Sequence, residues 1–270
     1  MDLIQIIVLA IVQGITEFLP ISSSGHLILL PEVTGWADQG LVTDVMVHVG
    51  SLFAIIVYFW RDVLRLIGGG FQLLMFKWTD ASRLAAYILL ATIPALAFGL
   101  FLKMTGFLDM VRQDQNLKLQ VVAWTAIVYG ILLYVADRYG LRINRLENMR
   151  MSPALIIGFA QALALIPGTS RSGITITAAR ALGYERSEAA RFSFLLGIPA
   201  IAAAGLITYI EFLSVGEPMP KEALYAAGLT FFSALGAIAF LMAMVKRMSF
   251  LPFVLYRLAL GVVLLIFAYS

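Results

Sequence analysis

Six long apolar runs decide what kind of fold this chain can adopt. A helix of about 20 apolar residues crosses the hydrocarbon core of a bilayer. The runs lie at residues 41–60, 84–102, 119–136, 192–213, 223–245 and 250–269. The 270-residue chain is 61% hydrophobic and 13% charged, which leaves little for a water-soluble domain. We predict an all-α integral membrane protein with six transmembrane helices in one membrane domain, residues 1–270, and exclude a soluble catalytic domain.

Two further apolar stretches, residues 3–30 and 153–183, are interrupted near their middle. Residues 20–25 read Pro-Ile-Ser-Ser-Ser-Gly, and residues 167–173 read Pro-Gly-Thr-Ser-Arg-Ser-Gly. Each half is too short to cross a bilayer comfortably. Non-helical backbone at membrane depth persists only where protein or a wet cavity satisfies its polar groups. We therefore predict that both stretches form re-entrant helix–loop–helix hairpins.

The two hairpins resemble each other. When Gly25 is aligned with Gly173, Gln13 falls on Gln161, and each hairpin is followed by three predicted crossings. An odd number of crossings inverts the second unit relative to the first, which predicts an inverted-topology repeat with broken helices near the midplane. The repeats would comprise residues 1–136 and 150–270. The alternative is a chance similarity between two Gly/Ser loops.

The distribution of basic residues predicts the orientation of the chain. Segments 61–83, 137–150 and 246–247 are rich in Lys and Arg, whereas 31–40 has neither and 214–222 has one lysine. Because basic loops remain in the cytoplasm, the first hairpin and both chain termini are expected on the outer side.

The overall charge indicates which kinds of molecule the chain can bind. With 19 Lys+Arg against 16 Asp+Glu the net charge is +3, which fits loops beside anionic lipid rather than a nucleic-acid surface. The sequence has no cysteine, so disulfides, thiolate metal sites and a cysteine nucleophile are excluded.

The first hairpin gathers reactive side chains around its break. Ionisable side chains are costly inside a membrane and are functional candidates there by default. Gln13 and Glu17 share a helical face, and the break adds three hydroxyls and an imidazole: Ser22, Ser23, Ser24 and His26. Such groups supply a ligand for a hard cation, a nucleophile and a proton carrier. The alternative is that the serines cap the second half-helix and His26 hydrogen-bonds within the bundle.

The second hairpin carries the opposite charge. In residues 168–173 the glycines let the backbone curl, and Arg171 adds an unpaired guanidinium to an otherwise apolar segment. Backbone N–H groups gather at the start of the following helix, so a loop of this kind binds phosphate oxygens. Turns and helix caps without a ligand use the same small residues, which is the alternative here.

Other charged residues in or near the apolar segments are weaker candidates. Asp44 and His48 are four residues apart and either support the site or form a mutually satisfied buried pair. Arg257, in the last crossing, is expected to have a structural partner or to extend toward the interface, with a direct role in the site less favoured. Four residues at the end of the second hairpin and beyond it are expected to form a solvated cytoplasmic rim: Arg180, Arg186, Glu188 and Arg191.

The two broken segments carry motifs that resemble those of a known family. Residues 13–26 read Gln-Gly-Ile-Thr-Glu-Phe-Leu-Pro-Ile-Ser-Ser-Ser-Gly-His, and residues 167–175 read Pro-Gly-Thr-Ser-Arg-Ser-Gly-Ile-Thr. With segments 193–196 and 250–257, the chain resembles the bacterial undecaprenyl-diphosphate phosphatases, also called bacitracin-resistance proteins, over nearly its whole length. The resemblance implies an inner-membrane enzyme that regenerates the lipid monophosphate carrier of cell-wall synthesis. Combined with the charge pattern, it places hydrolysis on the periplasmic face.

The same resemblance implies roles for individual residues. Gln13 and Glu17 match the family's (E/Q)xxxE motif, which is linked to a divalent cation, Mg²⁺ or Ca²⁺, and the amide leaves one carboxylate fewer for the metal. Ser23 and His26 match its catalytic serine and histidine, and Arg171 matches the arginine of its PGxSRSGxT motif. The hydroxyls expected around the substrate phosphates belong to Ser22, Ser24, Ser170, Ser172 and Thr175.

The sequence leaves more than one mechanism and one rival function open. We prefer attack by Ser23 with His26 taking its proton, while attack by His26 or by a metal-bound water stays open. The expected partners are a polyprenyl diphosphate and membrane lipids, as a monomer or a homodimer. The rival function is a transporter of polyprenyl phosphate through the same anion site, because inverted repeats with broken helices are also a transporter design. Translocation needs no nucleophile, so the reactive residues favour hydrolysis.

Overall fold

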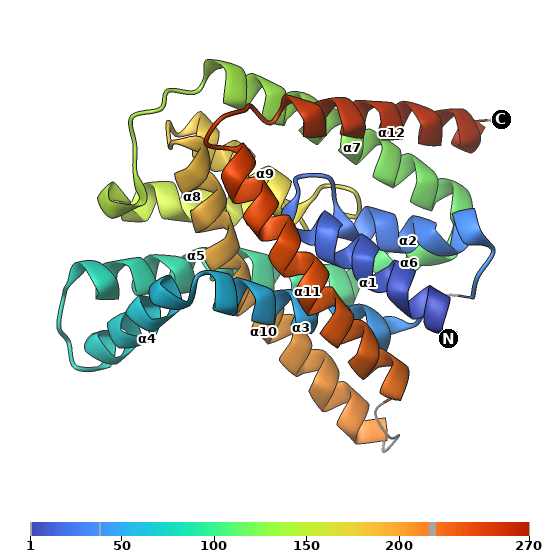
Figure 1. Ribbon diagram of the computed structural model, residues 1–270, viewed down its shortest axis with the longest axis horizontal. Coiled ribbons are helices and arrows are strands. Elements are labelled where there is room, and N and C mark those ends of the chain that lie inside the picture. The colour runs from blue at the N-terminus through green and yellow to red at the C-terminus, as the bar shows by residue number, and fades with distance from the viewer. Residues whose placement is uncertain (1, 38, 216–219, 270) are drawn as a thin grey trace.

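The computed structural model describes residues 2–37, 39–215 and 220–269, which fold into helices joined by short loops (Figure 1). The predicted outer loop 214–222 therefore lies partly outside the described residues. The helices are α1 (Leu3–Phe18), α2 (Ser23–Thr34), α3 (Leu41–Tyr58), α4 (Trp60–Leu74), α5 (Asp80–Thr105), α6 (Phe107–Gln113), α7 (Gln115–Tyr139), a 3-10 turn (Leu146–Asn148), α8 (Met151–Leu163), α9 (Arg171–Ala181), α10 (Arg186–Val215), α11 (Lys221–Met244) and α12 (Leu251–Tyr269).

The long apolar runs form the long helices. Among the described residues, five helices are long and apolar enough to cross a membrane: α5, α7, α10, α11 and α12. They coincide with the last five predicted crossings. The chain is therefore an all-helical, multi-pass membrane protein.

The first predicted crossing, 41–60, differs from the prediction of a straight span followed by a loop. Helix α3 ends at Tyr58, and the chain bends by 91° into α4, which continues to Leu74. Segment 61–83 is therefore largely helical rather than a loop. Helix α4 has one polar and one apolar face, so only one of its sides favours an apolar environment. Helix α3, in contrast, is apolar along most of its length.

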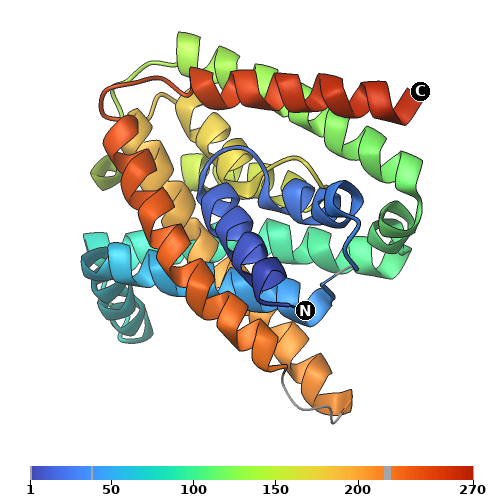
Figure 2. The same ribbon diagram turned by 45° about the vertical axis from the view of Figure 1, so that its right-hand side comes forward.

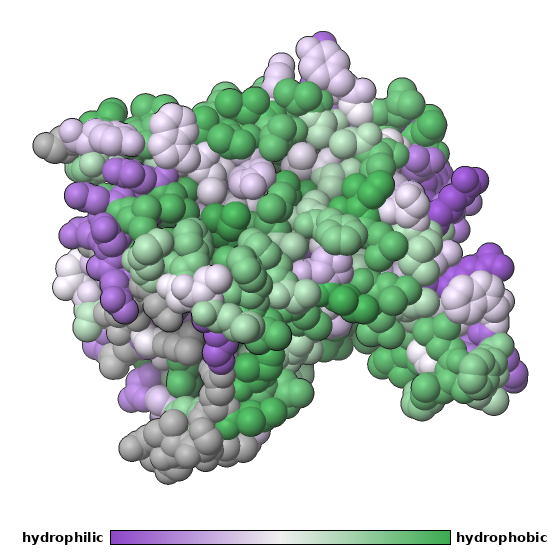
Figure 3. All heavy atoms as spheres, turned by 180° about the vertical axis from the view of Figure 1, so that it is seen from behind, coloured by the Kyte–Doolittle hydropathy of each residue, from purple (hydrophilic) through white to green (hydrophobic). Residues whose placement is uncertain are grey.

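The broken helices lie in the middle of the molecule (Figures 1 and 2). Helix α1 packs on α11 and α3, α8 packs on α5, and α9 lies between α7 and α10. Small residues let these helices approach closely: a Cβ at Gly50 would collide with the carbonyl of Ala227, and one at Gly158 with that of Ala91. Close backbone approach is how helices associate inside a bilayer. The surface in Figure 3 is correspondingly apolar over much of its area.

The predicted solvated rim is wrong for Arg180, whose side chain is fully buried. It donates to Asp137 at 3.1 Å and to backbone carbonyls that include those of Gly140 and Leu141. Asp137 also pairs with Arg186 and accepts from the backbone N–H of Phe250. One carboxylate thus joins α7, α9, α10 and the start of α12. A buried cation persists because it is paired and hydrogen-bonded.

The other members of that rim also have partners. Arg191 pairs with Asp62 of α4 and lies 3.6 Å from Glu188, which accepts from the backbone N–H of Leu146. These contacts join the start of α10 to α4 and to the 3-10 turn. In Figure 1 both chain ends lie at the right, whereas the α4–α5 turn and the segment between α7 and α8 lie at the left.

Candidate active site

The breaks after α1 and α8 share one capping geometry. Ser22 and Ser170 both have positive φ angles, 76° and 72°, which residues other than glycine rarely adopt. Each serine caps the next helix by accepting from a backbone N–H, that of Gly25 at 3.3 Å or Gly173 at 3.1 Å. These residues correspond under the same alignment that pairs Gln13 with Gln161. The capping serines therefore aim the first turns of α2 and α9 in a similar way.

Glu17 lies where the two breaks meet. Its Oε2 accepts from the hydroxyl of Ser23 at 2.7 Å and from the amide of Gln13 at 3.2 Å. Its Oε1 accepts from Nη2 of Arg171 at 3.0 Å. The carboxylate is only 5% exposed, so these partners replace its lost hydration. The fold thus brings a serine, a carboxylate and a guanidinium into direct contact.

Arg171 is paired, contrary to the prediction of an unpaired guanidinium. Besides Glu17 it donates to the carbonyl of Ser193 in α10 at 3.0 Å. A Cβ at Gly197, one turn further along α10, would collide with the guanidinium, so this glycine leaves the space that Arg171 fills. The partner is 154 positions away in the sequence, and no local pattern indicates it.

A cavity of about 340 Å³ opens beside these groups. Its polar wall consists of Glu17, Ser23, Ser24, Asp44, His48, Ser170 and Arg171. Its apolar wall consists of Val45, Ala164, Leu165, Ala200, Ile201, Ala204 and Gly205. A charged group and an apolar chain can therefore bind next to each other.

The predicted phosphate ligands divide into two groups. Ser24, Ser170 and Arg171 line the cavity. Ser22, Ser172 and Thr175 do not line it and are buried. Ser22 caps α2, Ser172 donates to the carbonyl of Leu19 at 3.2 Å, and Thr175 to that of Arg171 at 2.7 Å. The bonds of Ser22 and Ser172 thus hold the loops in place, whereas that of Thr175 lies within α9.

The two histidines have different positions. His26 bonds through Nδ1 to the carbonyl of Ser22 and through Nε2 to the hydroxyl of Tyr256, and it does not line the cavity. His48 lines the cavity, with Nδ1 on the carbonyl of Asp44 and Nε2 3.5 Å from Glu17. Sequence spacing alone ranks His26 higher. In the structure the hydrogen-bond partners of His26 are Ser22 and Tyr256, and His48 is the histidine that faces the cavity.

Arg257 has structural partners, as expected, and its side chain is fully buried. Its guanidinium donates to backbone carbonyls of both breaks and of α7: Pro20, Thr169, Gly168, Thr125 and Ala126. A buried arginine that satisfies several carbonyls at once holds non-helical backbone where water is scarce. Arg257 thus ties the two breaks together.

Proteins of similar sequence identify the family of this chain. The model of the bacitracin resistance protein BacA family matches residues 6–263. The chain belongs to the BacA family. It is 50% identical to an undecaprenyl-diphosphatase of Erythrobacter litoralis, with 99% of this chain and all of the relative covered. It is 47% identical to proteins of that name from Jannaschia and Roseobacter denitrificans over the full length of both chains.

The donors around Glu17 can be tested against the cation expected of a BacA-family site. Glu17, Gln13 and Ser23 offer oxygen atoms, which hard divalent cations prefer. Oε1 of Gln13 is buried and has no hydrogen-bond partner, so its lone pairs are available to a cation. Within the described ranges no three His, Cys, Asp or Glu side chains gather closely enough to hold a metal. Glu17, Gln13 and Ser23 are therefore the residues that would hold a divalent cation, with one carboxylate among them.

Proposed function

We propose that the protein hydrolyses undecaprenyl diphosphate to undecaprenyl phosphate and inorganic phosphate, and thereby recycles the lipid carrier and confers bacitracin resistance. The BacA-family match and the names of the full-length relatives support this activity. The observation that carries the mechanism is the contact of Ser23 with Glu17, at 2.7 Å, beside Arg171. This contact supports a mechanism in which a nucleophile, a proton acceptor and a phosphate ligand share one cavity.

The reaction begins at the hydroxyl of Ser23. Its oxygen attacks the terminal phosphorus, its proton passes to Glu17, and the bond between that phosphorus and the bridging oxygen breaks. The lipid monophosphate leaves, and water then cleaves the phosphoserine to release inorganic phosphate and restore the hydroxyl. The position of His26 argues against it as the proton acceptor, because its ring nitrogens bond to Ser22 and Tyr256.

Arg171 orients the terminal phosphate. Its guanidinium is held by Glu17 and Ser193, so it presents fixed donors to the cavity without reorganisation during the reaction. A divalent cation, Mg²⁺ or Ca²⁺, would be held by Glu17 and Gln13 and would neutralise phosphate charge when bound. Ser24 and Ser170 add hydroxyls at the cavity wall.

The prenyl tail leaves the cavity through an adjoining apolar groove of about 400 Å³ between α3, α10 and α11. The groove and the cavity share Val45 and Gly205, so head and tail bind in continuous space. Replacing Gly205 with Ile should raise KM for the long-chain diphosphate and leave a short isoprenyl diphosphate unaffected. Gly228→Ile is the control, because nothing lies within 4 Å of a Cβ there.

The two broken segments are re-entrant hairpins of an inverted repeat, and the cavity faces the periplasm of a bacterial inner membrane. The shared capping geometry supports the repeat, and the separation of basic segments from the chain ends in Figure 1 supports the orientation. The sequence has no cysteine, so single cysteines report position directly. A cysteine at exposed Ala37 should react with an impermeant thiol reagent in whole cells, and one at exposed Asn148 only after lysis. The reverse pattern contradicts the orientation.

Hydrolysis is separated from transport by purified protein in detergent, where no compartments exist. We expect release of inorganic phosphate from undecaprenyl diphosphate, stimulated by divalent cation and lost in Ser23→Ala. Absence of release from folded protein that still binds the lipid would favour the transporter.

A further inference from the structure

Helix α4 presents an apolar stripe to the surroundings. Its large apolar side chains recur with helical spacing and are 52–77% exposed: Trp60, Leu64, Ile67, Phe71 and Leu74. The other side of α4 packs on α5, where a Cβ at Gly69 would collide with the carbonyl of Ala81. Helix α4 is bent by 91° from the preceding apolar helix, and amphipathic helices commonly lie in the plane of a membrane interface. In Figure 3 this end of the molecule projects as a lobe with apolar and strongly hydrophilic surface side by side.

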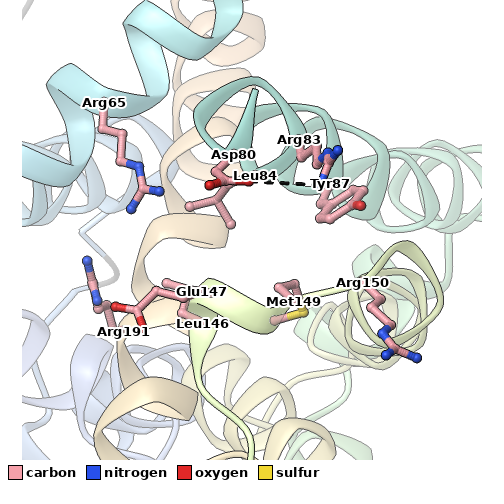
Figure 4. A pocket seen from close by; sticks show the side chains of 10 residues that line it. All are labelled: Arg65, Asp80, Arg83, Leu84, Tyr87, Leu146, Glu147, Met149, Arg150 and Arg191. Carbon is pink, nitrogen blue, oxygen red and sulfur yellow. Dashed lines mark ion pairs between the residues drawn. The ribbon is translucent and has the colours of Figure 1, made fainter. Parts of the chain in front are cut away.

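A hollow lined by arginines lies beside α4. It consists of two adjoining cavities of about 150 and 600 Å³, which share Arg83, Glu147, Met149 and Arg150. Figure 4 shows its walls, α5 on one side and the segment around the 3-10 turn on the other. Arg65 reaches from α4 toward one end, and Arg150 stands at the other. Arg65, one of the residues that line the hollow, belongs to α4 itself.

The lining of the smaller cavity has an excess of positive charge. Four arginines face two carboxylates, those of Asp80 and Glu147. Arg191 is already neutralised by Asp62, and Arg83 is 3.9 Å from exposed Asp80. Among the described residues, Arg65 and Arg150 have no carboxylate within 4 Å. Two arginines are therefore available to an external anion.

We propose that this hollow binds the phosphate headgroup of an anionic glycerophospholipid, whose acyl chains lie along the apolar stripe of α4. Basic pockets between membrane helices bind such headgroups. Arg65 lines the hollow and follows Leu64 of the stripe in α4, so the two parts are close enough for one ligand with an apolar and an anionic part. The site is separate from the cavity at Glu17 and shares no lining residue with it.

Binding is measured by native mass spectrometry of the full-length protein in detergent, titrated with phosphatidylglycerol. The double variant Arg65→Gln/Arg150→Gln removes two charges without breaking an ion pair. We expect about thirtyfold weaker binding, because each arginine near anionic lipid contributes about fivefold. The matched control is Arg138→Gln/Arg142→Gln, which removes two exposed arginines that do not line the hollow and should bind as wild type does. Glu147→Gln should strengthen binding several-fold, since it removes a negative charge from the lining.

Two further titrations identify the ligand. Phosphatidylcholine carries the same phosphate with a compensating cation and should bind at least tenfold more weakly than phosphatidylglycerol. Millimolar inorganic phosphate should leave bound phosphatidylglycerol in place. Equal binding of both lipids, displacement by inorganic phosphate, or equal losses in the two double variants would each overturn the lipid site. Hydrolysis by Arg65→Gln/Arg150→Gln in detergent should equal that of wild type, which shows that the variant is folded.

Discussion

The break after α1 and the break after α8 share a capping serine but differ in the side chains on either side of it. Under the alignment of Gly25 with Gly173, Ser23 corresponds to Arg171 and Glu17 to Leu165. All four of these residues line the same cavity. Matching positions of the two breaks therefore face the same cavity. The first break contributes the proposed nucleophile and the carboxylate, and the second contributes the cation. The difference teaches that the site depends on both breaks, because neither has a complete set of reactive groups.

The largest expected effect comes from the first break. Ser23→Ala should lower kcat by on the order of 10⁴ or more, because loss of an attacking group leaves only binding and electrostatic stabilisation. Ser24→Ala removes the adjacent hydroxyl from the same cavity and should cost less than about tenfold, the loss of one neutral hydrogen bond. Steady-state phosphate release distinguishes the two. Similar losses in both variants would show that Ser23 is one ligand among several rather than the nucleophile.

Glu17→Gln removes the carboxylate of the first break, whose matching position in the second break is the uncharged Leu165. The amide keeps the shape of the side chain but cannot take the proton of Ser23, so we expect a decrease in kcat of about 10²–10⁴. The response to added Mg²⁺ or Ca²⁺ should also disappear, because the only charged ligand is lost. Gln13→Ala is the comparison: it should weaken the cation response and retain most of the maximal rate. Near-normal turnover of Glu17→Gln with intact cation dependence would contradict both roles of the carboxylate.

Arg171 tests the second break. Arg171→Ala should lower kcat by about 10²–10³, the usual effect of removing a preorganised donor at a developing charge. Arg171→Lys should recover only a small part, because an ammonium lacks the planar fork that reaches Glu17 and phosphate together. The sequence alone suggests no loss of stability. The ion pair suggests a loss of about 3 kcal/mol in the alanine variant, since Glu17 would be left buried without its cation.

Thermal unfolding in detergent measures that difference. Arg171→Ala should unfold at a lower temperature than wild type, and the double variant Glu17→Gln/Arg171→Ala should recover part of the loss because no charge remains unpaired. If both variants unfold together with wild type, the pair contributes no stability.

The sequence predicts the helices better than their contacts. Long apolar runs identify five spans because hydropathy and length are local properties. The bend between Tyr58 and Trp60 was missed because the charges of α4 resemble those of a loop, although its apolar residues have helical spacing. Arg180 was misplaced because its partner Asp137 lies in another helix.

The candidate site shows the same division. Local spacing groups Glu17 and Ser23, six residues apart, around one break, and the structure joins them by a hydrogen bond. Spacing also suggests His26, which lies three residues after Ser23, but the direction of α2 turns its ring toward Tyr256. His48 enters the cavity from α3, which only tertiary packing decides. The only local signal was the spacing of four residues between Asp44 and His48. It indicates that the two side chains share a helical face, but not which part of the molecule that face contacts.

The smallest effects concern the feature that the two breaks share. Ser22→Ala and Ser170→Ala each remove a helix cap and keep a Cβ at positive φ, so each should cost about 1 kcal/mol, or about 2–4 °C in Tm. Ser22→Gly and Ser170→Gly lose the same cap but relieve the backbone, and should unfold within about 1 °C of wild type. Matching losses at the two positions would support one duplicated device. Activity separates them further: Ser170 lines the cavity and Ser22 does not, so Ser170→Gly should raise KM by a few-fold while Ser22→Gly leaves it unchanged. Equal increases in KM would mean that both serines reach the substrate and that the breaks are alike in binding as well as in shape.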